Sequence, residues 1–176
     1  MSDSKDFDSP FVDLGETITL PLQLEGLTIQ RAQPSSIKLL VSLESRDDLP
    51  KVGQVQKTEV KCYILGLAPG RWIAVKENGT LCLKNYIRAN CYMTDIESEW
   101  AVLSMSGGRA REVIQCLCPV DMYSWEVKSN FCFQSTISLH PVLIVNIGAK
   151  EKFHVFMPRS YARSALERIY DTALII

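Results

Sequence analysis

The sequence predicts an α+β fold: an antiparallel, β-rich sandwich or half-open barrel with a short internal helix and a C-terminal amphipathic helix packed on the sheet. Three observations favour this class. The chain of 176 residues contains a dense series of short apolar runs rich in β-branched and aromatic residues. One internal segment and the C-terminal segment change to the helical period. Hydrophobic residues make up 47% of the chain, which is enough to form a core.

The apolar runs predict strands because turn-forming residues, namely Gly, Pro, Asn and Ser, separate one run from the next. The expected strands are Glu16–Leu22, Ile37–Leu43, Glu59–Leu65, Trp72–Lys76, Thr80–Tyr86, Glu99–Met105, Met122–Lys128, Phe131–Leu139, Val142–Ile147 and Phe153–Met157. Asn78 and Gly79 predict a type I′ hairpin, because both turn positions need a positive φ. Residues 30–36 and 45–57 are expected to be loops, because they collect proline, glycine and polar residues.

Two segments follow the helical period. In Arg109–Leu117, the residues Ala110, Val113, Ile114 and Leu117 are spaced i, i+3, i+4 and i+7, which predicts a short amphipathic helix that ends before Pro119. Ser160–Leu174 predicts a longer helix that covers one face of the sheet. Its expected apolar face consists of Ala162, Ala165, Leu166, Ile169, Tyr170, Ala173 and Leu174.

The length predicts one domain over residues 14–176, after a disordered acidic tail over residues 1–13. The first fifty residues hold four Lys and Arg against nine Asp and Glu, and the remainder holds fifteen against eleven. This asymmetry is compatible with an anionic partner or head-to-tail self-association; chance together with a solvated acidic tail is the alternative. The excess of positive charge is too small to predict sequence-specific nucleic-acid binding.

The expected location is intracellular. The N-terminus lacks the apolar region of a signal peptide, and no apolar run approaches the roughly 20 residues of a transmembrane helix. Six cysteines without a signal peptide predict reduced thiols.

The sequence predicts no catalytic residues, no metal site and no cofactor. Only His140 and His154 are available to activate a cysteine, and no local catalytic signature surrounds any cysteine. Cys116 and Cys118 lack the spacing and the second pair of a zinc site. Asp95, Glu97 and Glu99 are expected to form a solvated edge that discourages strand pairing.

Several basic residues are candidates for contact with an anionic surface. The turn at Gly107 and Gly108 opens the first helix, and free N–H groups at such a turn are able to bind an anion. The candidate contact residues are Arg109, Arg111, Lys150, Lys152, Arg159 and Arg163. Ordinary surface charge is the alternative for this set. Trp72 is a candidate exposed anchor, and a core position is the alternative.

The C-terminal stretch Glu151–Ile175, EKFHVFMPRSYARSALERIYDTALI, resembles the small matrix proteins of non-segmented negative-strand RNA viruses. The short plant rhabdovirus (cytorhabdovirus) matrix proteins are the most similar in length. The resemblance implies a protein of the virion and host cytoplasm that is peripheral at membranes. It also implies self-association, binding to anionic lipid and the nucleocapsid, and contact with a glycoprotein tail.

The leading hypothesis is therefore a non-enzymatic structural assembly protein of the matrix type. The second is a soluble binding module or host-interaction factor, such as a counter-defence protein, that binds one partner without polymerising. An enzyme that uses one of the cysteines is the third.

Overall fold

The computed structural model describes residues 20–44, 46–58, 62–77, 83, 91–124, 130–148 and 151–176. The described chain forms two open sheets and two α-helices, and every strand pair is antiparallel. The α+β class, the antiparallel strands and the C-terminal helix are confirmed. The predicted tail over residues 1–13 and the Asn78-Gly79 hairpin lie outside the described residues.

The larger sheet has six strands. In spatial order they are β1 (Leu22–Leu24), β2 (Leu27–Ala32), β8 (Trp100–Ser106), β11 (Lys152–Pro158), β10 (His140–Asn146) and β9 (Phe131–Ile137). The smaller sheet has five strands: β4 (Val55–Lys57), β5 (Cys62–Ala68), β6 (Arg71–Lys76), β3 (Ser36–Ser42) and β7 (Cys91–Asp95). Two short 3₁₀ turns, η2 (Glu97–Glu99) and η3 (Arg159–Tyr161), precede β8 and the last helix.

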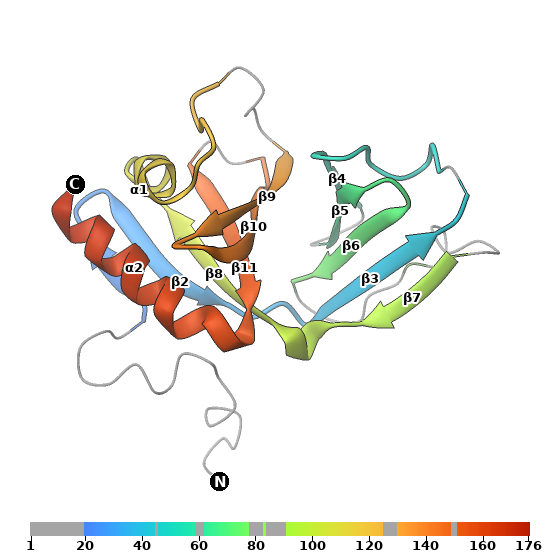
Figure 1. Cartoon of the computed structure of the whole chain (residues 1–176), viewed down its shortest axis with the longest axis horizontal. Coiled ribbons are helices and arrows are strands. Elements are labelled where there is room, and N and C mark those ends of the chain that lie inside the picture. The colour runs from blue at the N-terminus through green and yellow to red at the C-terminus, as the bar shows by residue number, and fades with distance from the viewer. Residues whose placement is uncertain are drawn as a thin grey trace, which may run out of the picture.

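The chain passes twice between the sheets. It leaves the larger sheet at the end of β2 and enters the smaller one at β3 after three residues. It returns from β7 to β8 through η2, and Figure 1 shows both passages between the two sheets. Part of the predicted loop at residues 30–36 is therefore strand, because the end of β2 pairs with β8.

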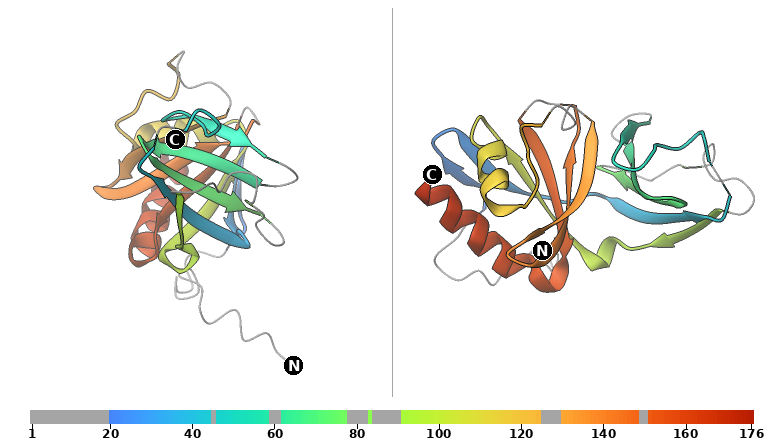
Figure 2. Two further views of the ribbon diagram at one scale, coloured as in Figure 1. Left: turned by 90° about the vertical axis from the view of Figure 1, so that its right-hand side faces the viewer. Right: turned by 45° about the horizontal axis from the view of Figure 1, so that its top comes forward.

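Helices α1 (Ala110–Leu117) and α2 (Ala162–Ile175) lie on the face of the larger sheet that is turned away from the smaller sheet (Figures 1 and 2). The core between them includes Leu103 and Val155 of the sheet, Ile114 of α1 and Leu166 of α2. Leu174, expected on the apolar face, is 56% exposed because it is turned about 100° around the helix from Ala173, which is buried in this core.

The opposite face of the larger sheet packs on the smaller sheet. Val102, Phe156 and Leu143 contribute to this second core from one side, and Leu65 and Ile73 from the other. The central strands of the larger sheet are therefore buried on both faces, which explains why β8, β10 and β11 have continuous apolar runs.

Candidate functional site

A polar pair joins the two sheets inside the second core. Tyr63 of β5 and His154 of β11 are 2% and 6% exposed, and 3.2 Å separates Tyr63 Oη from His154 Nδ1. Burial raises the pKa of Tyr63 well above its ordinary value. Burial and the nearby charge of Lys152 lower the pKa of His154 to about 4. Both side chains are therefore neutral at pH 7, and the hydrogen bond pairs the tyrosine hydroxyl with one of the two ring nitrogens of His154.

Ser104 lies beside this pair. It faces His154 across the β8–β11 ladder and is 3% exposed. Its Oγ has no hydrogen-bond partner among the described residues. The three residues place a small polar cluster between sheets that are otherwise joined by apolar side chains.

The cluster does not have the properties of a cysteine-activating base. Burial raises the pKa of Cys118 and of Cys132 to about 11, so both thiols are protonated at neutral pH. The Cys132 thiol contacts the carbonyl oxygen of Gly66 at 3.5 Å, and His154 is bonded to Tyr63. Within the described ranges, no three His, Cys, Asp or Glu side chains are grouped to hold a metal ion.

The Gly107-Gly108 turn packs against another turn. Gly107 has a φ of 114°, and a Cβ on it would lie 2.3 Å from the carbonyl oxygen of Gly26. The amide of Gly107 donates to Glu151, that of Arg109 to Gly26 and that of Ala110 to Gly107. These N–H groups are used within the fold, so they are not free to bind an anion.

Arg109 and Arg111 both have partners within the fold. Arg109 donates to the carbonyl oxygens of Glu25 and Ala173, each at 2.9 Å. Arg111 lies 3.4 Å from the Glu151 carboxylate, donates to the Met122 carbonyl and stacks over the Phe153 ring. These contacts hold α1 to its neighbours, which is a structural role.

The other described candidates are divided: Lys152 follows Glu151, the partner of Arg111, whereas Arg159 lies in η3 and Arg163 at the start of α2. Lys152 is exposed, Arg159 is half-buried, and Arg163 pairs with Glu167 at 3.0 Å. Arg109 contacts Ala173, which lies ten residues after Arg163 and so about 15 Å further along α2. Lys150 lies outside the described residues.

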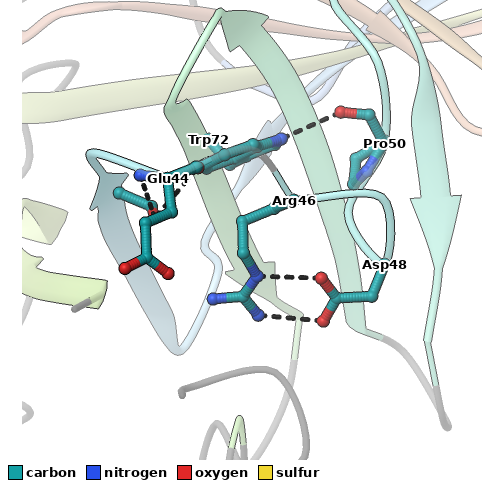
Figure 3. Close-up of polar contacts among 6 residues, drawn as sticks. Glu44, Arg46, Asp48, Pro50 and Trp72 are labelled. Atoms are coloured by element: carbon teal, nitrogen blue, oxygen red, sulfur yellow. Dashed lines mark hydrogen bonds and ion pairs between the residues drawn. The ribbon is translucent and has the colours of Figure 1, made fainter. Parts of the chain in front are cut away.

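Trp72 is a core residue, and the structure corrects the prediction of an exposed anchor. It is 5% exposed, and its indole N–H donates to the Pro50 carbonyl at 2.8 Å (Figure 3). Arg46 and Asp48 form a two-bond ion pair in the same loop, at 2.8 and 2.9 Å. The loop covers the outer face of the smaller sheet, where Leu49 packs with Leu40 and Trp72.

The most exposed of the described strands is β7, the edge strand of the smaller sheet. Tyr92 is 67% exposed and Met93 is 44% exposed. Asp95 pairs with Lys38 of β3 at 3.0 Å and accepts the amide of Glu97, and these bonds lower its pKa. The sequence predicts no strand at Cys91–Asp95, because only the pairing with β3 identifies this strand.

Comparison with solved structures identifies the fold. A chain of the heterotetrameric sarcosine oxidase from Corynebacterium sp. U-96, in complex with pyrrole 2-carboxylate, is similar with a TM-score of 0.79 and 18% identity. The alignment covers 94% of each chain. The glycine cleavage system aminomethyltransferase T from Bartonella henselae is similar with a TM-score of 0.62 and 16% identity, over 82% of this chain and 45% of that one. No protein-family model and no curated protein sequence matches.

These similarities overturn the viral matrix hypothesis. Both similar structures belong to metabolic enzymes, and neither is a matrix protein. The predictions of virion assembly, of binding to anionic lipid and a nucleocapsid, and of contact with a glycoprotein tail are therefore wrong. The resemblance rested on strands followed by an amphipathic helix, an order that unrelated folds share. No described helix is long and apolar enough to cross a membrane.

Proposed function

We propose that this protein is a subunit of a hetero-oligomeric enzyme, in which it binds another chain and performs no catalytic step itself. One observation carries the proposal: the fold matches a chain of a heterotetrameric oxidase over 94% of both chains. The similarity therefore extends over nearly a whole subunit of that assembly. At 18% identity, this similarity shows that the two chains share a fold. The role of this chain as a subunit of an assembly is what we propose.

The chemistry of the described core supports a non-catalytic role. The buried histidine is bonded to tyrosine, with a pKa of about 4, and two buried thiols have pKa values of about 11. None of these groups has the properties of a base or nucleophile that works at neutral pH. Large exposed side chains such as Tyr92 and Met93 of β7 offer contact area to a partner.

The test is isolation of the affinity-tagged full chain from cells of its own source, followed by size-exclusion chromatography with light scattering. The expected result is a complex of defined stoichiometry that contains at least one different chain, identified by its mass. A chain that elutes as a monomer, or only with copies of itself, contradicts the proposal.

A further inference from the structure

One edge of strand β7 is not paired with any other described strand. It is the last strand of the smaller sheet, and β3 is its one strand partner in the described part of the chain. Cys91 is half-buried, and Tyr92, Met93, Thr94 and Asp95 are all exposed. Figure 1 shows β7 beside β3 at the outer margin of the sheet. Alternate backbone N–H and C=O groups of such a strand point away from the sheet and are able to pair with another strand.

The usual protection of an edge strand is lacking along most of β7. Proteins guard such edges with charged residues, prolines or bulges. The stretch of residues 91–94 contains no lysine, arginine, aspartate, glutamate or proline, and the register with β3 runs without a bulge. Asp95 is the single charged residue of β7, and it is already bonded to Lys38. Glu97 and Glu99 lie in η2, beyond the strand, so the predicted acidic guard does not extend along the edge.

The side chains of β7 favour a protein partner. Tyr92 and Met93 are neighbours in a strand, so they project from opposite faces of the sheet. Tyrosine and methionine are enriched in protein interfaces. A strand added at this edge therefore finds a large side chain to pack against on each face.

The charge at this edge favours pairing of β7 with a different chain over pairing with a second copy of this chain. The end of β7 is acidic, because Asp95 is followed by the exposed Glu97 and Glu99. The β7 strand itself contains no lysine or arginine, and Lys38 already bonds Asp95. In parallel register, a second copy brings its own Asp95, Glu97 and Glu99 to this acidic end, whereas a segment of another chain with lysine or arginine complements it.

We propose that β7 pairs with an extended segment of a different chain, and that this segment places lysine or arginine beside Asp95, Glu97 and Glu99. The proposal rests on the proposed function and identifies the surface that serves it. Such pairing combines backbone hydrogen bonds for affinity with side-chain contacts for specificity.

The experiment compares hydrogen exchange of the full chain alone and in the complex isolated from its own source. We expect slower exchange of the β7 amides in the complex. Lysine at an edge strand opposes pairing, so the double variant Tyr92→Lys, Met93→Lys is expected to weaken association about tenfold or more. Leu139→Lys is the matched control, because Leu139 is 91% exposed in a turn of the other sheet. The pair Glu97→Gln, Glu99→Gln is expected to reduce the salt dependence of the affinity.

The outcomes separate this proposal from the proposed function. Two results together support both proposals. The β7 amides exchange more slowly in the complex, and the Tyr92→Lys, Met93→Lys variant associates more weakly whereas Leu139→Lys does not. A complex that leaves β7 exchange unchanged and tolerates the β7 lysines overturns the docking site while the proposed function stands. A homodimer protected at β7 shows that the occupant is a second copy, which contradicts the choice of partner. No association at all overturns the proposed function and this inference with it.

Discussion

Gly107 and Gly108 are adjacent residues with different structural demands. Gly107 has a φ of 114° and approaches the Gly26 backbone so closely that a Cβ would meet its carbonyl oxygen at 2.3 Å. A Cβ on Gly108 would have no atom within 4 Å. We expect Gly107→Ala to lower the free energy of unfolding by about 2 kcal/mol. Gly108→Ala is the matched control, with stability unchanged or raised by up to about 1 kcal/mol in urea unfolding. Equal effects of the two substitutions contradict the packed turn.

Single residues also show what the sequence leaves undetermined. The exposure of Trp72 depends on a loop that returns to it, with Pro50 lying 22 residues away in sequence. The hydrogen bond between Tyr63 and His154 joins residues 91 positions apart. No local pattern brings such residues together. Ser138 and Leu139 both have positive φ angles and form the two-residue turn between β9 and β10. Glycine usually marks such a turn, and here it is absent from both positions.

Elements with a strong local period were predictable. The apolar spacing identified both α-helices to within two residues at each end. Strands buried on both faces, such as β10 and β11, were predictable from continuous apolar runs. By contrast, β2 was missed because Gln30 and Arg31, at its end, are polar residues that resemble a loop. The pairing order of the strands is non-local, and no single-sequence pattern encodes it.

The docking of α2 has a sharp test within the helix. Leu166 is fully buried against the larger sheet, whereas Leu174 is 56% exposed. Leu166→Asp buries an unpaired charge, so we expect it to lower the free energy of unfolding by at least about 3 kcal/mol. Leu174→Asp makes the same chemical change at the exposed end and is expected to cost less than about 1 kcal/mol. Similar melting temperatures for the two variants would show that α2 is not docked as described.

At the scale of the whole molecule, the contact between the sheets makes stability depend on pH. The pKa of His154 is about 4 in the folded protein, against 6.5 as its ordinary value in an unfolded chain. Between these values the unfolded chain binds a proton that the folded protein does not. The free energy of unfolding therefore falls as pH drops through this window, by about 3 kcal/mol in total. Above pH 6.5 both states leave the histidine neutral, and this effect ends.

Removing the polar pair is expected to remove this acid sensitivity. The double variant Tyr63→Phe, His154→Leu replaces both partners with apolar groups, so neither is left unpaired in the core. Urea unfolding between pH 7 and pH 4 is the measurement, and the double variant is expected to retain about 3 kcal/mol more of its neutral-pH stability than the wild type. His140→Leu is the control: it removes the other histidine and keeps His154, so it is expected to retain the wild-type dependence.

Both sheets contribute to the core around the pair, so they are expected to lose structure together on acidification. If the free energy of unfolding of the wild type and of the double variant depends on pH to the same extent, His154 is not the group responsible for the acid sensitivity.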